Sequence, residues 1–126
     1  MENHHENQIQ QLVTNIYELI IASYSARSGV VEIAFKTYPV MNRELSIEAP
    51  NLFSTPIRIS SDKFKDILSN ESYITPFTHE GRIVRTFREK VFEILNKTGF
   101  GSVKLIFKNT NIVLEKTTSY AEKYTF

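Results

Sequence analysis

The chain has 126 residues, of which 41% are hydrophobic and 23% are charged, and its formal net charge is +1. These values are typical of one globular domain; they exclude the disordered and fibrous classes, and the net charge alone gives no reason to expect a polyanionic partner. The chain contains no cysteine, which excludes disulfides, thiolate nucleophiles and cysteine-ligated zinc and favours a cytoplasmic protein over a secreted one.

The first part of the chain predicts a flexible tail followed by a long helix. Residues 1–6 are polar and lack the basic patch and apolar run of a signal peptide, so we expect them to lie outside the core. Apolar residues then recur at steps of three and four from Ile9 to Tyr24, which predicts an amphipathic helix over about 7–26. The longest apolar stretch, Leu19 to Ala22, is far too short to span a bilayer, so no membrane partner is expected.

Three segments in the first half of the chain have the alternation of half-buried strands. Apolar and polar residues alternate at 31–36, at 44–48 and at 57–59. The connections between these segments are too short for parallel crossovers, so an antiparallel meander is the simplest arrangement.

Two helices are predicted to follow. Ser60 or Ser61 caps a short helix that carries Phe64 and Leu68, and a loop with apolar anchors extends from there to residue 79. Thr78 caps a long helix over about 80–98, which ends with the basic and glycine residues expected at a C-terminus.

A hairpin and a short tail complete the prediction. Residues 103–107 and 112–114 are predicted to form the two strands of a hairpin. The residues between them are rich in asparagine, which suits a tight turn because Asn tolerates a positive φ. Residues 7–118 are thus predicted to form a single domain. Residues 119–126 are predicted as a C-terminal tail that docks through its aromatic residues on the domain or on a partner.

This element order, α-β-β-β-α-α-β-β, predicts a two-layer α+β fold. An antiparallel sheet of about five strands packs against the N-terminal helix and the long helix of the second half. In element order alone the chain resembles the secretion-chaperone class of small dimeric α+β proteins. We expect a homodimer, because the sheet has edges and Ile20 and Ile21 place apolar side chains on more than one side of the first helix.

The sharpest local feature is a run of arginines in the long helix. Arg82, Arg85 and Arg88 step by three residues, so they fall within an arc of about 120° on the helix surface. Three guanidinium groups suit phosphate or carboxylate, and Lys104 would add to them if its strand borders the helix. The alternative is local pairing, of Arg85 with Glu89 and of Arg82 with Glu80.

Aromatic residues lie close to these arginines in the sequence. Tyr73 and Phe77 fall in the loop before the long helix, and aromatic residues together with arginine are enriched at binding hot spots. We therefore predict a site for a partner or an anion formed by six residues: Tyr73, Phe77, Arg82, Arg85, Arg88 and Lys104.

No catalytic signature has a recognisable spacing in this chain. His79 with Glu80 is explained by helix capping, and the strand glutamates are explained by cross-strand pairing. No metal site and no cofactor are predicted.

Three functions follow from these features. The preferred one is a small non-enzymatic protein of prokaryotic or phage origin that binds another protein, as an inhibitor, immunity protein, adaptor or chaperone. The second is recognition of a nucleotide or nucleic acid, with the arginines on phosphate and Tyr73 or Phe77 stacked on bases. The third is a hydrolase that uses His79 and a strand glutamate.

Overall fold

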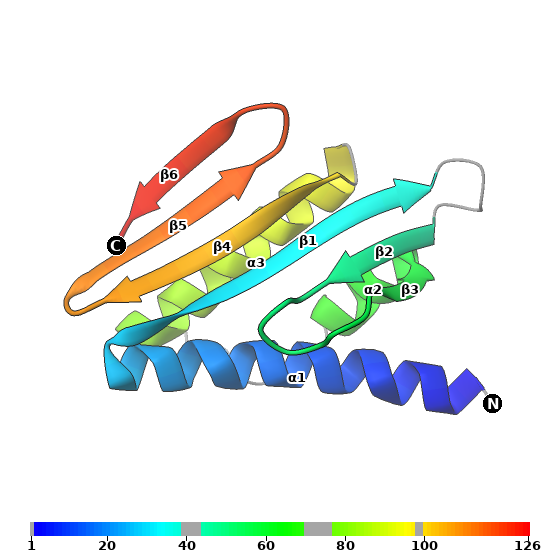
Figure 1. Ribbon diagram of the computed structural model, residues 1–126, viewed down its shortest axis with the longest axis horizontal. Helices are drawn as coiled ribbons and strands as arrows, with labels where there is room; N and C mark the ends of the chain where they lie inside the picture. The colour runs from blue at the N-terminus through cyan, green and yellow to red at the C-terminus, as the bar shows by residue number, and fades with distance from the viewer. Residues whose placement is uncertain (1, 39–43, 70–76, 98–99) are drawn as a thin grey trace.

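A computed structural model describes residues 2–38, 44–69, 77–97 and 100–126 (Figure 1). Three helices and six strands are found in this part of the chain. They are α1 (Glu2–Ala26), β1 (Ser28–Tyr38), β2 (Glu44–Glu48), β3 (Ile57–Ser60), α2 (Ser61–Ser69), α3 (His79–Lys97), β4 (Gly101–Lys108), β5 (Asn111–Thr117) and β6 (Ala121–Thr125). The predicted α+β class is confirmed, with one strand more than expected.

The strands form one antiparallel sheet in the order β3-β2-β1-β4-β5-β6. Each half of the chain supplies a meander of three strands, and β1 joins the two meanders by pairing with β4 from Ser28↔Lys108 to Phe35↔Gly101. The predicted meander of β1, β2 and β3 and the predicted hairpin of β4 and β5 are both present. The pairing of β1 with β4 completes the sheet.

Regular secondary structure extends close to both ends of the chain. The backbone is helical from Glu2, so the segment 2–6 continues α1. At the other end, residues 121–125 form β6, which pairs with β5 from Thr117↔Ala121 to Val113↔Thr125. β6 has the sequence Ala-Glu-Lys-Tyr-Thr, which is too polar to show the apolar alternation of a strand.

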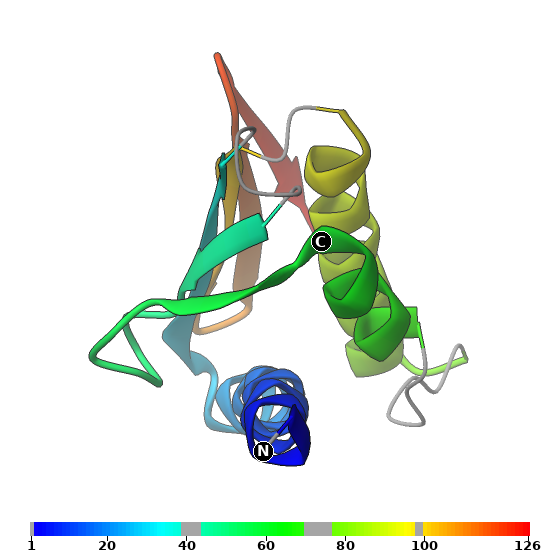
Figure 2. The ribbon, with the colours of Figure 1, turned by 90° about the vertical axis from the view of Figure 1, so that its right-hand side faces the viewer.

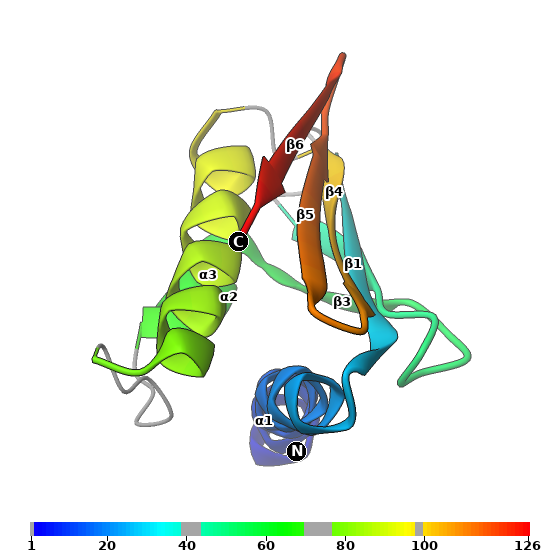
Figure 3. The same ribbon diagram turned by 90° about the vertical axis from the view of Figure 1, so that its left-hand side faces the viewer.

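The sheet and the helices α2 and α3 form two facing layers, and α1 crosses below the space between them (Figures 2 and 3). Alternate side chains of the strands point toward the helices and are buried, among them Ile33, Phe35 and Leu105. The rings of Phe35 and Phe64 lie 5.8 Å apart, between the sheet and α2. None of the helices in the described ranges combines the length and the apolar character needed to cross a bilayer.

The turn at the end of the β4–β5 hairpin is tied to the end of α1. Asn109 has a φ of 57°, the positive φ expected of an asparagine in this turn. Its backbone N–H donates a hydrogen bond of 2.9 Å to the carbonyl of Arg27, the residue that follows α1. Arg27 also has a φ of 57°, so the helix ends in a left-handed residue before Gly29 is reached.

Both predicted helix caps are present. The Ser60 hydroxyl accepts a 3.2 Å bond from the N–H of Lys63 at the start of α2. At the start of α3 the Thr78 hydroxyl accepts a 3.0 Å bond from the N–H of Gly81. These bonds satisfy amide groups that a helix N-terminus leaves without partners.

Thr78→Ala should lower the free energy of unfolding by about 1 kcal/mol, because the amide of Gly81 loses its acceptor. The effect is measured by urea denaturation followed by circular dichroism. Thr78→Ser keeps the hydroxyl and serves as the control, with the midpoint of the wild type. An alanine variant as stable as the serine variant would show that the cap contributes nothing.

Candidate functional site

The predicted arginines form one solvent-facing surface on α3, which we call the arginine face. Arg82 and Arg85 are exposed and Arg88 is half-buried, whereas Ile83 and Val84 between them are buried. This arrangement follows from the helical repeat, which turns the apolar positions toward the sheet and the arginines away from it. The side chains therefore point away from the core.

Local pairing neutralises part of this surface. Arg85 Nε lies 4.0 Å from Glu89 Oε1, and both side chains are about half exposed, at 44% and 59%. Such a pair contributes at most about 0.5 kcal/mol in water. In the described residues, neither Arg82 nor Arg88 has a carboxylate within ion-pairing distance, so the alternative pair of Arg82 with Glu80 is not formed.

Phe77 lies one residue before the cap of α3 and is 94% exposed. A fully solvated phenyl ring forgoes about 1.5–3 kcal/mol of burial energy, so a partner that covered it would recover that energy. Tyr73, the other aromatic residue predicted in this site, lies outside the described residues.

An open groove continues the arginine face toward the end of α2. It has a volume of about 510 Å³ and is lined by Ser69 from α2 and by five residues of α3: Arg88, Glu89, Phe92, Glu93 and Asn96. Phe92 is half-buried there. The residues that line the groove are therefore mostly polar, and they place one half-buried phenyl ring beside an arginine that has no carboxylate partner among the described residues.

The structure does not bring Lys104 to the arginine face. Lys104 lies on β4 between Val103 and Leu105, which are buried on the side of the sheet that α3 covers. Because strand side chains alternate, Lys104 points to the opposite side of the sheet, and Lys108 does the same. β4 does border α3, as the prediction required, but the lysines face the other way.

His79 makes a contact between helices. Its Nδ1 lies 3.0 Å from the hydroxyl of Tyr24 on α1, and the two rings are in an edge-to-face arrangement with centroids 5.5 Å apart. The glutamates of the central strands, Glu32 and Glu115, point to the side of the sheet without helices, so the structure does not join them with His79. The described ranges hold no group of residues that could bind a metal ion.

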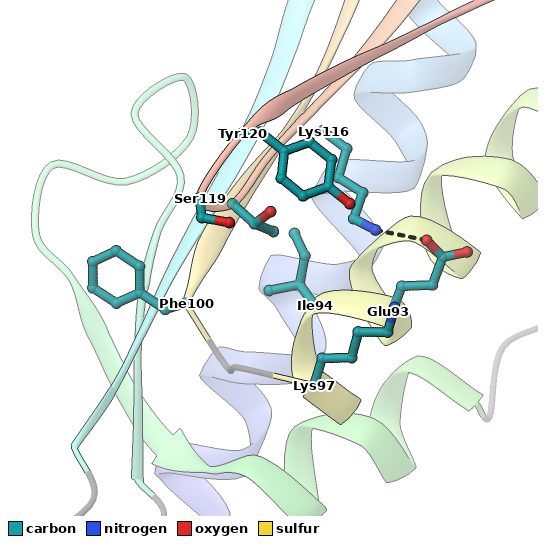
Figure 4. Close-up of a pocket in the computed structure, with 8 residues that line it drawn as sticks. Glu93, Ile94, Lys97, Phe100, Lys116, Ser119 and Tyr120 are labelled. Atoms are coloured by element: carbon teal, nitrogen blue, oxygen red, sulfur yellow. Dashed lines mark hydrogen bonds and ion pairs between the residues drawn. The ribbon is translucent and has the colours of Figure 1, made fainter.

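The structure also contains a pocket that the sequence did not predict (Figure 4). It has a volume of about 480 Å³ and lies between the C-terminal part of α3, the start of β4 and the connection from β5 to β6. Phe100 and Tyr120 line it and are 56% and 64% exposed. The remaining lining residues are Glu93, Ile94, Lys97, Lys116, Thr118 and Ser119. We call this cavity the Lys116 pocket.

Lys116 is the unusual residue of this pocket, because its side chain is only 9% exposed. Its Nζ donates a 2.8 Å hydrogen bond to Glu93 Oε1 and lies 3.6 Å from Glu122 Oε1. Glu93 also accepts a 3.2 Å bond from Lys90, whose ammonium lies 4.2 Å above the ring of Tyr124. The network connects α3 to β5 and β6.

The network shifts the pKa of each of its three main charged groups. The hydrogen bond from Lys116 lowers the pKa of Glu93 against the opposing effect of burial. The same bond raises the pKa of Lys116, again against burial. For Lys90, burial acts to lower the pKa, but the hydrogen bonds with Glu93 and Tyr124 outweigh it and raise the pKa. All three groups stay charged at neutral pH, and Lys116 forms ion pairs with two carboxylates.

One signal in the sequence did mark Lys116. It follows Ile112 and Leu114 on the apolar phase of its strand, so alternation alone places it toward the helices. Its carboxylate partner on α3 lies 23 residues earlier in the chain, and no local pattern connects the two.

Comparison of the chain with protein-family models, with curated proteins and with solved structures found no match. The function is therefore inferred from the geometry of the chain itself.

Proposed function

We propose that this protein acts by binding another protein, and that the arginine face of α3 together with Phe77 forms the contact surface. The observation that carries the proposal is the combination of Arg82 and Arg88, without carboxylate partners in the described part of the chain, with a phenyl ring that is 94% exposed. Arginine and aromatic residues are the types most enriched at binding hot spots.

The chemistry of the surface indicates the chemistry of the partner. The arginines favour a partner with carboxylates, which guanidinium groups bind with two parallel hydrogen bonds. Phe77, which is exposed, favours an apolar contact. We therefore expect an acidic protein surface that carries at least one apolar side chain.

A charge reversal on this face tests the proposal. Arg85→Glu and Arg82→Glu should each weaken partner binding more than tenfold, because each places a carboxylate against an acidic surface. The measurement is affinity capture from a native lysate with the wild type and each variant as bait, with the captured polypeptide quantified and its affinity then measured in purified form.

Lys36→Glu provides the matched control. Lys36 is exposed on β1, where it pairs in register with Ser46, on the side of the sheet away from α3. The substitution makes the same change in net charge and should leave the affinity unchanged. Equal affinity of the wild type and of both arginine variants would remove the arginine face from the function.

The same variants distinguish recognition of nucleic acid. A 20-mer of oligothymidylate is titrated onto the wild type at low and at high salt, with fluorescence anisotropy as the readout. If binding falls steeply with salt and is lost in Arg82→Glu, the arginine face recognises a phosphate backbone and not a protein. We expect the oligonucleotide to bind more weakly than the captured polypeptide does.

A further inference from the structure

One face of the sheet is turned away from α2 and α3, and no helix of the described residues covers it (Figures 2 and 3). We call it the open face. Side chains alternate along each strand, and the strands pair in a fixed register, so the residues of the open face form rows that run across the sheet. Three such rows cross β1, β4, β5 and β6.

The central row consists of four charges of alternating sign. Following the register from β1 to β6, it contains Glu32, Lys104, Glu115 and Lys123. Lys123 Nζ lies 3.7 Å from Glu115 Oε2, and Glu32, Lys104 and Glu115 are half-buried among their neighbours. The row thus carries no net charge, but it has a defined order.

The rows on either side of the charges differ from each other. On one side the row is mostly apolar and contains Val30, Ile106, Val113 and Thr125. Val30 is 38% exposed, and it borders a cavity that also contains Asn51 and Ala22 of α1. On the other side the row has short side chains, those of Ala34, Ser102, Thr117 and Ala121.

We propose that a second copy of this chain packs on the open face, related to the first by a two-fold axis that runs along the strands between β4 and β5. Such an axis reverses the order of the strands, so that β4 faces β5 of the second copy and β1 faces its β6. Lys104 then meets Glu115 of the second copy, and Glu32 meets its Lys123.

The order of the charges selects this axis. A two-fold axis in the same plane but perpendicular to the strands would place Glu32 on Glu32 and Lys104 on Lys104, and juxtaposed like charges oppose association. The axis along the strands instead brings every charge of the row opposite a charge of the other sign. A row with the signs − + − + is complementary to its own reversal.

The flanking rows fit the same axis. Ile106 meets Val113 of the second copy, and Ser102 meets its Thr117, so apolar residues face apolar residues and small residues face small residues. Short side chains allow two sheets to approach to the usual spacing of about 10 Å. α3 lies on the far side of each sheet, so the dimer leaves both arginine faces exposed and does not depend on the function proposed for them.

The test is a pair of charge reversals measured separately and mixed. The wild type should be a dimer by sedimentation velocity at micromolar concentration. Lys104→Glu and Glu115→Lys should each raise the dimer dissociation constant at least about a hundredfold, because the symmetry places two like-charge contacts in each dimer. An equimolar mixture of the two variants should form a heterodimer, since the carboxylate introduced in one variant then meets the ammonium introduced in the other.

Three outcomes would each overturn the proposal. They are a monomeric wild type, a dimer that survives both reversals, and a mixture of the two variants that stays monomeric. Circular dichroism and thermal unfolding establish that the single variants fold. If either one does not, Ser102→Arg replaces it: the long side chain in the small-residue row should separate the sheets without altering the charges of the central row, and an intact dimer of this variant would equally overturn the proposal.

Discussion

Gly101→Ala is expected to lower the free energy of unfolding by roughly 3 kcal/mol, from about 1–3 kcal/mol of backbone strain and a similar cost of overpacking. Gly101 begins β4 with a φ of +153°, a conformation that L side chains rarely adopt. A methyl group at this position would lie 2.5 Å from the carbonyl oxygen of Thr117 on β5. Because the obstacle is backbone in a paired strand, no side-chain rotation relieves it.

The prediction is checked by urea denaturation of the wild type and the variant. Ser102→Ala, one residue along the same strand, is the matched control: its side chain is half-buried on the open face, and the change should cost less than about 0.5 kcal/mol. A Gly101→Ala protein as stable as this control would mean that β4 and β5 separate at this end without cost.

Gly29 is a useful comparison, because it has a φ of +143° but a different obstacle. Its added methyl group would lie 2.5 Å from the Ser23 hydroxyl oxygen and 3.0 Å from the Ser23 Cβ on α1. The hydroxyl can rotate away, whereas the Cβ cannot move without α1. The backbone strain is similar at the two glycines, but the neighbour of Gly29 can move in part. Gly29→Ala should therefore lower the free energy of unfolding less than Gly101→Ala does.

Much of the fold could be predicted because its signals are local. The helix period of α3 and the alternation of β1 depend on residues a few positions apart, and Thr78 and Asn109 have the side chains that their backbone positions require. Each of these features is decided within one turn or one strand. A single sequence therefore contains enough information to place them.

The parts that could not be predicted depend on contacts that are distant in sequence. The pairing of Ser28 with Lys108 joins the two meanders, and nothing near either residue specifies the other. β6 is polar and is held by β5 and by the network around Lys116. The position of Lys104 was in contrast predictable: Val103 and Leu105 hold the apolar phase of β4, so alternation alone places Lys104 on the side away from the helices.

The largest electrostatic effect is expected at Glu93, because it is the main partner of the buried Lys116. Glu93→Gln should lower the free energy of unfolding by about 1–2 kcal/mol at pH 7, between the values typical of exposed and of buried ion pairs. Glu93 is 40% exposed, which places the loss below that of a fully buried pair. Glu122 remains near Lys116 and limits the loss further.

Lys116→Met, in contrast, should change the free energy of unfolding only slightly. It removes the buried charge and fills the same space with an apolar chain, and Glu93 keeps Lys90 as a partner. Replacement of a buried ionic group by a side chain of similar volume is often neutral or stabilising, so we expect a change within about 1 kcal/mol of the wild type. A large loss of stability in Lys116→Met would show that the network stabilises the fold beyond satisfying its own charges.

The pH dependence distinguishes the network from simple packing. The pKa of Glu93 is lowered from its ordinary value of 4.5, so its contribution is complete above that pH and is lost as the pH falls through the lower value of the folded state. The pKa of Lys116 is raised from 10.5, so its contribution is complete below that pH and is lost as the pH rises through the higher folded value. The difference in unfolding free energy between the wild type and Glu93→Gln should therefore be constant near neutrality and shrink toward acid pH. A difference that stayed the same down to the acid limit would assign the effect of the substitution to packing, because a protonated Glu93 no longer differs in charge from glutamine.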